Sequence, residues 1–480
     1  MNDASSPRVY DLPYPRFKRH FTDFIGIGDN GHLWVEGCDV VELAKTYGTP
    51  LYVVSENQFR HNYRRFRDAF VKRYPGPVEI LFANKSNNSL AVRHIMNQEG
   101  AGGDAFGTNE MYLALLTGAD PKKMVLNGSN KEPEEIDMAI ANGICINIDA
   151  MDELDLILET SKRLGKDVDV GIRTKLELKP LENRFATQIH GPGSLAEQAR
   201  NHKWGMPYSQ TVALIKRIQG VKNLHLKELN YHLSRMDNKA DDFAVMARDM
   251  VQWMAKLRDD TGWIAPWLDL GGGWTFGRPE KTGPLHGMDD ESTPSFEEYA
   301  EAVCSALQDE CKRLKLPLPG IKIEPGRSVS GTCGIAVGRV GAIKEWPEYK
   351  KKWVNVDLSE NHVIWVKKPH YFHIVVANKA SAAPAETVDI VGPLCTIDLL
   401  GGQRHLPKLV RGDYVALLDT GAYSESTSAN FNAQFRAATV MVSGSQADVT
   451  TERERLSDVA GRYRVPPRLL EKTFRGKPKA

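Results

Sequence analysis

The stretch VEILFANK, Val78–Lys85, is the first of eight short β-rich runs that indicate the fold of this 480-residue chain. Each run ends in polar or glycine residues, and a helix-like stretch separates it from the next. The other seven runs are Gly102–Phe106, Met124–Gly128, Cys145–Asp149, Asp169–Arg173, Glu228–Leu233, Trp267–Gly273 and Ile321–Arg327. Strands that alternate with helices favour a parallel sheet covered by helices. Eight is also the number of strands that closes into a (β/α)8 barrel.

The segments between these runs carry apolar residues at helical spacing, which predicts helices that pack on the sheet. The clearest candidates are Glu110–Thr117, Pro133–Asn142, Asp152–Leu164, Tyr208–Ile218 and Ala240–Asp259. An open, doubly wound sheet is the alternative architecture for this pattern. We favour the barrel because polar residues follow nearly every predicted strand instead of gathering at one switch point.

After Arg327 the pattern changes to β-branched segments separated by glycine, proline and polar turns, which is typical of an antiparallel β domain. The segments are Gly334–Trp346, Lys352–Asp357, His373–Val376, Thr387–Val391, Asp413–Leu418 and Ala438–Val442. We therefore expect four parts, which are an N-terminal segment (1–50) that joins the β domain, the barrel (51–330), the β domain (331–450) and a helical tail (451–480).

The chain has 62 basic and 61 acidic residues, so its charge gives no reason to expect nucleic acid or an anionic membrane as a partner. No apolar run is long enough to predict a transmembrane helix, and Met1–Tyr14 lacks the apolar core of a secretion signal. The six cysteines are scattered without a C-x-x-C pair, which suggests neither a zinc site nor a disulfide framework. A reduced, cytoplasmic setting is therefore expected.

Polar and glycine residues stand at the predicted strand ends, where the chemistry of a barrel enzyme gathers. In chain order they are Lys85, Asp104, Asn127, Asp149, Arg173, His232, Gly271–Gly273, Glu324 and Arg327. A lysine in a barrel mouth is unusual because burial of an ammonium group is costly. The plainer interpretation of Lys85 is a surface lysine at a loop edge, so the residue alone does not decide between the two.

The run DLGGG, Asp269–Gly273, ends the seventh predicted strand. Successive glycines let backbone N–H groups approach an oxyanion closely and can form an anion-binding nest. Barrels commonly bind phosphate in the loops after strands seven and eight, and Gly326-Arg327 lies in the second of these loops. The two glycine-containing loops therefore predict a phosphate site.

A lysine that can form an imine, a phosphate cradle and a nearby carboxylate together suit pyridoxal phosphate, which acts as an electron sink. A carboxylate such as Glu324 can keep the pyridine nitrogen of this cofactor protonated, which deepens the sink. His232 is a candidate to stack on the ring, and its plainer interpretation is an internally hydrogen-bonded core histidine. The sequence therefore favours a pyridoxal-phosphate enzyme with Lys85 as the attachment point.

The segment FANKSN, Phe82–Asn87, resembles the Y-A-x-K-A-N cofactor motif of the diaminopimelate/ornithine decarboxylase family. Further matching motifs follow in the family's order and are Asp104 with Glu110, Asn127–Lys131, Lys203–Met206, Gly271–Gly273, Glu324–Arg327, Gly392–Cys395 and Asp419–Tyr423. The ordered set runs from about residue 33 to about residue 445 and is more similar to the diaminopimelate branch. Each motif is short, but their common order is specific.

The resemblance implies an amino-acid decarboxylase, a carboxy-lyase of fold type III, built from a TIM barrel that binds pyridoxal phosphate and a β domain. It further implies that Lys85 binds the cofactor covalently and that His232 stacks on its ring. The other implied cofactor contacts are Asp104, Gly271, Gly272, Gly273, Glu324, Gly326, Arg327 and Tyr423. The family works as a homodimer with shared active sites, in which Cys395 of one subunit donates a proton after carbon dioxide leaves at the other. A thiol can do so where water is excluded.

Three departures from the family pattern affect recognition of ligands. The H-x-G-S motif reads His232-Leu233-Ser234-Arg235, and we favour Arg235 as a ligand of a phosphate or a substrate carboxylate. The C-E-S-x-D motif reads Cys395–Asp398 and lacks the glutamate that reads the distal amino group of diaminopimelate. The stretch Trp365–Tyr371 carries lysines where the family has an arginine, and the two are not interchangeable. The substrate contacts expected from the resemblance are Arg327, Lys367, Tyr371, Thr396, Asp398 and Tyr423.

All three departures fall on or beside substrate-recognising positions, whereas Lys85, Glu324 and Cys395 are retained. We therefore expect amino-acid decarboxylation, with diaminopimelate or a non-standard or D-configured amino acid of a specialised pathway as the substrate. An amino-acid racemase is one rival, and it needs acid–base groups on both faces of the α-carbon. A relative that has lost the cofactor and binds a partner protein is a second. A metal-dependent barrel enzyme is a third, but the sequence offers no clustered ligand set.

Overall fold

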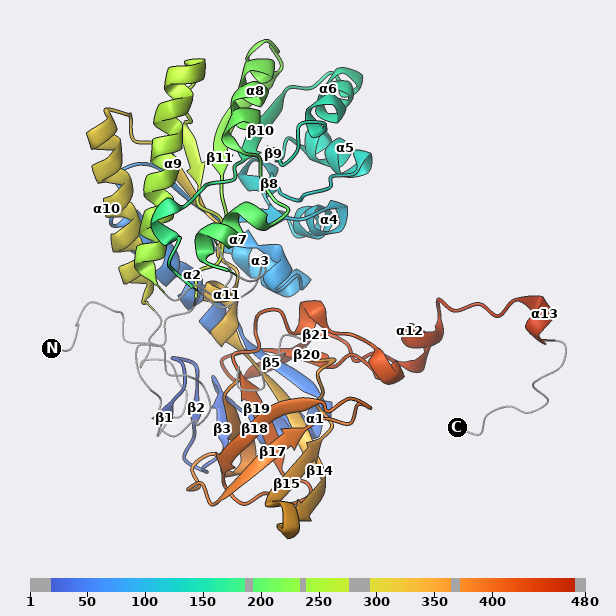
Figure 1. Ribbon diagram of the computed structural model, residues 1–480. Coiled ribbons are helices and arrows are strands. Elements are labelled where there is room, and N and C mark those ends of the chain that lie inside the picture. The colour runs from blue at the N-terminus through green and yellow to red at the C-terminus, as the bar shows by residue number, and fades with distance from the viewer. Residues whose placement is uncertain (1–18, 186–192, 234–238, 276–293, 364–371, 471–480) are drawn as a thin grey trace.

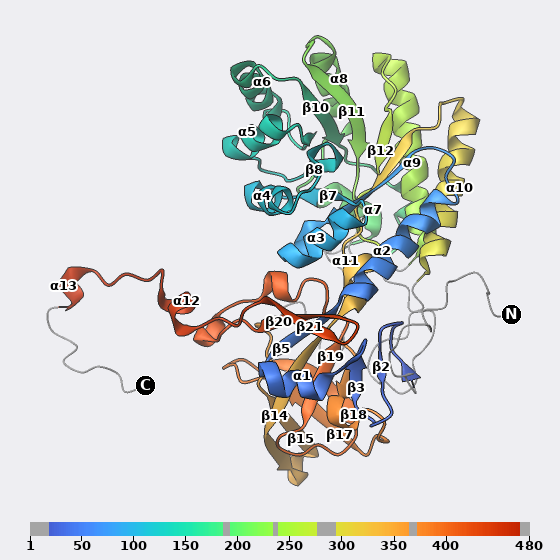
Figure 2. The same ribbon diagram turned by 180° about the vertical axis from the view of Figure 1, so that it is seen from behind.

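The computed structural model describes residues 19–185, 193–233, 239–275, 294–363 and 372–470, and it consists of two bodies joined by β5, α2 and α11 (Figures 1 and 2). One body is a closed barrel of eight parallel strands surrounded by helices. The other consists of β-sheets. The expected combination of a (β/α)8 barrel and a separate β domain is therefore confirmed.

The eight barrel strands are those that the sequence predicts, in the same order along the chain. They are β6 (Val78–Ala83), β7 (Gly102–Ala105), β8 (Met124–Leu126), β9 (Cys145–Ile148), β10 (Val168–Arg173), β11 (Leu224–Asn230), β12 (Trp267–Asp269) and β13 (Gly320–Ile323). The barrel closes where β13 pairs with β6, with Ile321 opposite Val78. All carboxyl ends of the strands therefore open to one mouth, which faces the β domain (Figure 1).

Helices cover the outer face of the barrel and bury apolar side chains against it. They are α2 (Glu56–Val71), α3 (Leu90–Gln98), α4 (Thr108–Leu116), α5 (Pro133–Asn142), α6 (Glu153–Leu164), α7 (Leu195–Asn201), α8 (Tyr208–Gln219), α9 (Ala240–Thr261), α10 (Phe296–Leu314) and the short α11 (Arg327–Ser330). The start of α10 shows how the sequence defines these helices, since Ser295 and Glu298 form a capping box there.

The second body contains two sheets. A small N-terminal sheet consists of β1 (Arg19–His20), β2 (Ile25–Ile27), β3 (Leu33–Val35) and β4 (Cys38–Asp39), followed by α1 (Val40–Tyr47). The large sheet consists of β5 (Leu51–Ser55), β14 (Gly334–Trp346), β15 (Lys351–Val356), β16 (Ile374–Val376), β17 (Glu386–Val391), β18 (Leu399–Leu406), β19 (Tyr414–Leu418), β20 (Ala438–Ser443) and β21 (Gln446–Thr451). Side chains of the two sheets share one hydrophobic core, so the N-terminal segment packs on the β domain.

Strand β5 corrects the expected start of the barrel at residue 51. It lies between β14 and β20 in the large sheet, with Val54 opposite both Gly334 and Met441. Its sequence, LYVVS, is fully buried and therefore reads like a barrel strand. The barrel strands begin only with β6, after α2 has crossed from one body to the other.

The large sheet also differs from the expected antiparallel pattern in two strand pairs. β5 and β20 are parallel, and so are β15 and β17. Both pairs join strands that are distant in sequence, for which short hairpin turns impose no direction. The remaining pairs of the sheet are antiparallel.

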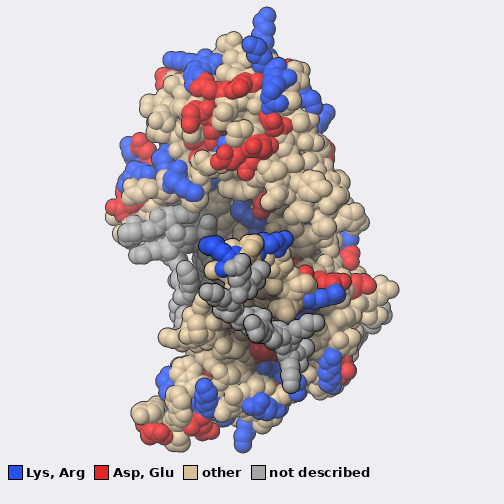
Figure 3. All heavy atoms as spheres, turned by 90° about the vertical axis from the view of Figure 1, so that its right-hand side faces the viewer, with Lys and Arg blue, Asp and Glu red and all other residues tan. Residues whose placement is uncertain are grey.

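The described part of the tail holds two short helices, α12 (Leu456–Ala460) and α13 (Pro467–Leu470), which extend away from both bodies (Figures 1 and 2). Basic and acidic side chains are mixed over the face of the molecule shown in Figure 3, on the barrel as well as on the β domain. Among the described residues, no helix is both long and apolar enough to cross a membrane.

The barrel core contains an aromatic cluster under α9 and α10 that provides a test of the fold. The fully buried ring of Phe243 stacks on Trp274 with ring centroids 4.1 Å apart. We expect Phe243→Ala to lower the free energy of unfolding by about 3–5 kcal/mol, since it removes a buried ring and leaves a cavity. Chemical denaturation followed by tryptophan fluorescence measures this loss. Phe185→Ala is the control, because that ring is 65% exposed, and an equal loss in both variants would contradict the prediction.

Candidate active site

Lys85 lies in the turn Asn84–Ser86, directly after β6, at the carboxyl end of the barrel. Its ammonium group forms an ion pair with the buried carboxylate of Asp104 at the end of β7. The ammonium nitrogen also lies 4.3 Å from the ring centroid of Phe106. One third of the Lys85 side chain is exposed (33%), so the amine is held in place and yet can be reached from the mouth.

A hydrogen-bonded row of side chains joins Asp104 to Glu324. The amide of Asn127 donates to Asp104 Oδ1 at 2.8 Å and to Glu324 Oε1 at 2.7 Å. Asn147, on the next strand, donates to Asn127 Oδ1 at 3.0 Å and so fixes the orientation of that amide. The strand ends β6, β7, β8 and β13 thus bring Lys85, Asp104, Asn127 and Glu324 together, as the sequence predicts.

The pKa values of Glu324 and Lys85 both lie above their ordinary values, for different reasons. Burial strongly raises the pKa of Glu324, and the neighbouring carboxyl groups of Asp104 and Asp269 raise it further. Burial would lower the pKa of Lys85, but the acidic groups around it, Asp104 foremost, more than offset this, and the pKa of Lys85 lies above its ordinary value. Lys85 is therefore held as an ammonium ion by its ion pair, and the surroundings of Glu324 favour its protonated form.

Glycines form the opposite wall of the site, after β12 and β13. Gly271 has φ +62°, and a Cβ there would lie 2.5 Å from the backbone oxygen of Tyr231. At Gly272 a Cβ would lie 2.8 Å from the backbone oxygen of Glu324 and 3.1 Å from His232 Nε2. These positions admit only glycine, so backbone groups line the turn, as a phosphate requires. The residues therefore fit the pyridoxal phosphate expected from the resemblance, and the imidazole of His232 lies against the turn.

The β domain completes the site through the segment after β19. The N–H of Tyr423 donates to the backbone oxygen of Ser86 at 2.7 Å, and Ser426 Oγ donates to the backbone oxygen of Lys85 at 3.0 Å. The guanidinium of Arg327 lies 4.8 Å from the ring centroid of Tyr423. A Cβ on Gly326 would lie 3.2 Å from Tyr423 Oη. The predicted residues Gly326, Arg327 and Tyr423 are thus neighbours, and they lie where the two bodies meet.

The loop after β17 lies elsewhere in the chain, within the β domain. Cys395 is exposed, and its N–H donates to Asn432 at 3.2 Å. The buried carboxylate of Asp398 accepts the backbone N–H groups of Glu360 at 2.7 Å and Leu394 at 2.9 Å. These contacts hold the loop in shape but do not join it to Lys85. Three other predicted residues, Arg235, Lys367 and Tyr371, lie outside the described part of the chain.

Sequence reasoning missed three residues of the site. Phe106 lies over the Lys85 ammonium, Asn147 orients Asn127, and Asp269 contacts Glu324. Asn147 and Asp269 are polar residues within otherwise apolar barrel strands, a signal that would have found them. Glu110 was identified only as a family landmark; its carboxylate accepts the N–H of Phe106 at 2.7 Å, and burial raises its pKa to about 7.

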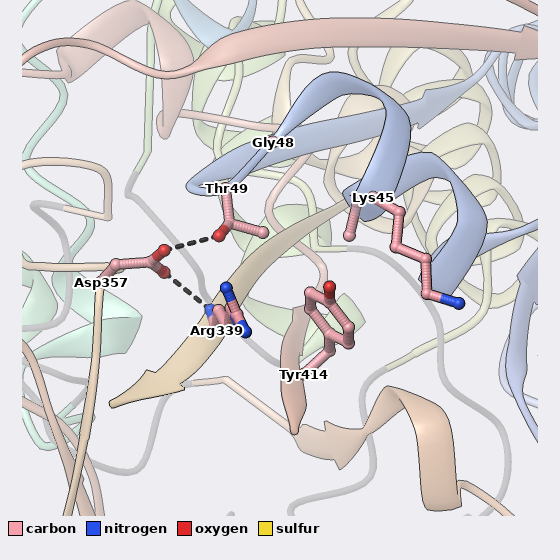
Figure 4. Close-up of a pocket in the computed structure, with 7 residues that line it drawn as sticks. Lys45, Gly48, Thr49, Arg339, Asp357 and Tyr414 are labelled. Atoms are coloured by element: carbon pink, nitrogen blue, oxygen red, sulfur yellow. Dashed lines mark hydrogen bonds between the residues drawn. The ribbon is translucent and has the colours of Figure 1, made fainter. Parts of the chain in front are cut away.

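A cavity of about 470 Å³ in the β domain is separate from this site (Figure 4). It is lined by Ala44, Lys45, Gly48, Thr49, Arg339, Asp357 and Tyr414. Asp357 accepts hydrogen bonds from Thr49 Oγ1 at 2.5 Å and from the backbone N–H of Arg339 at 2.7 Å. The carboxylate of Asp357 thus connects the segments that carry Thr49 and Arg339. None of the predicted site residues lines this cavity. Among the described residues, no group of His, Cys, Asp and Glu side chains is arranged to hold a metal ion.

Curated relatives match almost the whole chain. The diaminopimelate decarboxylase of Methanothermobacter thermautotrophicus is 30% identical over 453 residues, which cover 93% of this chain and 99% of the relative. That of Methanocaldococcus jannaschii is 31% identical over 457 residues, covering 93% and 98%. The crystal structure of a diaminopimelate decarboxylase from M. jannaschii aligns with a TM-score of 0.84 and 30% identity, covering 93% of this chain and 99% of that one. A second structure of that protein is a complex with L-lysine.

The ion pair between Lys85 and Asp104 can be tested before any cofactor is added. Asp104→Asn removes the negative charge that holds the pKa of Lys85 above its ordinary value. The pH midpoint for labelling of Lys85 by an amine-reactive ester should therefore move about 1–3 pH units lower. Peptide mass spectrometry of cofactor-free protein measures the midpoint. The exposed Asp120→Asn is the control, and an unchanged midpoint in Asp104→Asn would show that another group sets the pKa.

The family model described as "Pyridoxal-dependent decarboxylase, pyridoxal binding domain" matches residues 56–331. This range contains the barrel and, at its mouth, Lys85, the glycine turn and Glu324. Together with the relatives and their structures, the match shows the cofactor and the class of reaction. The chain belongs to the pyridoxal-phosphate-dependent decarboxylases, which are carboxy-lyases that act on amino acids.

Proposed function

We propose that Lys85 is the residue that binds pyridoxal phosphate covalently and that Glu324 faces the pyridine nitrogen. The distance between the two side chains is bridged by Asp104 and Asn127, which hold both in fixed positions. The exposed third of the Lys85 side chain gives the amine access to the mouth of the barrel. This arrangement of a reachable lysine opposite a deeply buried carboxyl group is the observation that carries the proposal.

In the same proposal, the phosphate lies between the two glycine-containing loops. Gly271, Gly272 and Gly273 would bind it through backbone N–H groups after β12, and Gly326 with Arg327 after β13. Tyr423, whose ring packs on Arg327, would close the site from the β domain. His232 would lie on one face of the ring, since its imidazole packs against Gly272. Arg235 is a further proposed ligand of the phosphate or of a substrate carboxylate.

The cofactor, when bound, accepts the electron pair that remains after carbon dioxide leaves the α-carbon. The chain's own residues then prepare and finish the reaction. Asp104 holds the Lys85 ammonium toward the mouth, and Lys85 must give up this proton before its amine can bond to carbon. Glu324 would lie opposite the pyridine nitrogen, where its negative charge would favour a proton on that nitrogen. The walls formed by the glycine turns and Tyr423 exclude water from the reacting carbon.

Cys395 is proposed to act as the proton donor in the active site of a partner subunit of a homodimer. Two observations support this. The thiol is exposed within one chain, and Ile397 beside it is 75% exposed, so both side chains are open to contact by a partner subunit. The carboxylate of Asp398 accepts two backbone N–H groups and so holds the loop in a fixed shape. All six cysteines are free, which favours a reducing compartment such as the cytoplasm.

Diaminopimelate is the proposed substrate, because the relatives with this activity align over almost the whole chain. The proposed contacts for its distal end and carboxylates are Arg327, Lys367, Tyr371, Thr396, Asp398 and Tyr423. One observation favours a second candidate. The carboxylate of Asp398 is occupied by two backbone N–H groups, and the neighbouring position 396 is a threonine. A loop of this kind offers little to a distal amino group and suits an amino acid with a different distal end.

Purified protein with pyridoxal phosphate can be screened against the stereoisomers of diaminopimelate and other L- and D-amino acids, with carbon dioxide release as the signal. We expect turnover of diaminopimelate or of one related amino acid. Lys85→Ala should abolish both turnover and the visible absorbance of the lysine-bound cofactor, since no other amine can take its place in the site. Inversion of configuration without carbon dioxide would instead identify a racemase.

The shared active site can be tested by mixing two inactive variants. Lys85→Ala lacks the attachment point, and Cys395→Ala lacks the proposed proton donor but should still bind the cofactor. When subunits exchange at random, about a quarter of the wild-type activity should return, because one site in each mixed dimer contains both residues. Each variant alone serves as the control. Normal turnover in Cys395→Ala, or no recovery in mixtures shown to contain mixed dimers, would remove Cys395 from the partner's site.

A further inference from the structure

Two carboxyl groups meet in the interior of the barrel, below the proposed position of the pyridine ring. Asp269 is the last residue of β12 and is fully buried, and Glu324 follows β13 and is 3% exposed. The backbone brings them together, because the N–H of Glu324 donates to the oxygen of Gly271 at 2.9 Å. The two side chains share a hydrogen bond. A hydrogen bond between two carboxyl groups requires a proton, so the pair holds one.

The two oxygens of Asp269 have different surroundings. Oδ1 accepts the N–H of Gly271 at 3.0 Å, at the start of the glycine turn. Oδ2 is buried, and no N–H or O–H of an ordinary donor among the described residues reaches it. A buried anionic oxygen without a donor is very costly, and the shared proton removes this cost. Asp269 therefore connects the phosphate side of the site to the carboxyl group on the pyridine side.

The two cations nearest the pair, Lys85 and Lys322, each form an ion pair with another carboxylate. From β11, Glu228 faces Asp269, but its partner is Lys322 of β13, at 2.5 Å. From the β6 and β7 side, Asp104 faces Glu324 and is paired with Lys85. Burial and then Glu228 raise the pKa of Asp269 to about 6, and burial, with Asp104 and Asp269 adding to it, raises the pKa of Glu324 well above its ordinary value. Glu324 faces two other carboxyl groups, Asp104 and Asp269, so we assign the shared proton to Glu324 in the cofactor-free protein.

We propose that Asp269 is a positioning residue that takes the shared proton from Glu324 when a protonated pyridine nitrogen comes to lie opposite Glu324. The proton leaves a Glu324 oxygen and bonds to Asp269 Oδ2, so the pair keeps a single negative charge, which now resides on Glu324. The proton on the pyridine nitrogen comes from solvent. Glu324 then accepts hydrogen bonds from Asn127, from Asp269 and from the pyridine nitrogen. This inference rests on the proposed role of Glu324.

The variant Asp269→Asn removes the shared proton but keeps the hydrogen bonds that Asp269 makes. Its amide oxygen can still accept the N–H of Gly271, and its NH₂ group can donate to Glu324, but an amide cannot hold the shared proton. Infrared difference spectroscopy detects the carbonyl band of a protonated carboxylic acid, identified by its shift in D₂O. In cofactor-free protein at neutral pH, the wild type minus Asp269→Asn difference should contain one such band.

Two further variants complete the experiment. Glu324→Gln replaces the other carboxyl group of the pair, so the carboxylic acid band should be missing from the spectrum of this variant as well. This second variant keeps the test decisive if Asp269→Asn does not fold. Asp389→Asn is the control, because this buried carboxylate of the β domain accepts hydrogen bonds from Gln403 and Lys351, and its pKa lies below the ordinary value. The wild type minus Asp389→Asn difference should contain no carboxylic acid band. Absence of the band in both active-site difference spectra would overturn the shared proton.

Loading with pyridoxal phosphate tests the transfer. The carboxylic acid band should persist at a shifted frequency, because Asp269 now carries the proton, and it should be missing in loaded Asp269→Asn. Loss of the band from the loaded wild type would show that the pair gives its proton away and would overturn the proposal. The role of Lys85 is judged separately, from the visible absorbance that Lys85→Ala should lack. If the wild type shows the visible absorbance of the lysine-bound cofactor but no infrared carboxylic acid band, the proton shared by Asp269 and Glu324 is refuted and the role of Lys85 stands. If the infrared band is present but the visible absorbance does not depend on Lys85, only the attachment site is refuted.

Discussion

The burial of charge inside the barrel is the constraint on which the site depends. Four carboxyl groups, of Asp104, Glu228, Asp269 and Glu324, lie in the interior at or near the strand ends, together with the ammonium groups of Lys85 and Lys322. Each buried charge destabilises the fold unless a partner compensates it. Lys322 compensates Glu228 and Lys85 compensates Asp104, so the strands must keep the register that brings these pairs together. The same pairing leaves one carboxyl group facing the mouth and ready for a cationic ligand.

The sequence predicts the barrel well because its strands are buried on both faces. Such strands read as short apolar runs that end in polar residues, and this signal is local. The expected barrel boundary at residue 51 placed β5 on the wrong side, since its pairing with β14 and β20 depends on residues far away in the chain. β18, Leu399–Leu406, was missed because two glycines and alternating polar residues interrupt its apolar pattern.

Within the site, the sequence indicates which side chains stand at strand ends but not which of them touch. Lys85, Asp104, Asn127 and Glu324 were predicted to share the mouth, and the closed barrel brings them together. The contact between Asp269 and Glu324 depends on the lateral spacing of β12 and β13, which no spacing along the chain reveals. The role proposed for Cys395 involves a second subunit, and a single chain shows only the exposed loop that carries it.

The position of β5 means that the barrel is an insertion within the β domain. β5 enters the large sheet before the barrel has begun, and its neighbour β14 follows only after the barrel is complete, although Val54 and Gly334 lie side by side in that sheet. During synthesis the strand must wait, unpaired, until all eight barrel strands have left the ribosome. Long-range pairing of this kind is slow and leaves an apolar edge open to misassembly. Tyr423, which contacts the Lys85 turn, is likewise synthesised only after all eight barrel strands, so the site is completed by a segment that follows the whole barrel in the chain.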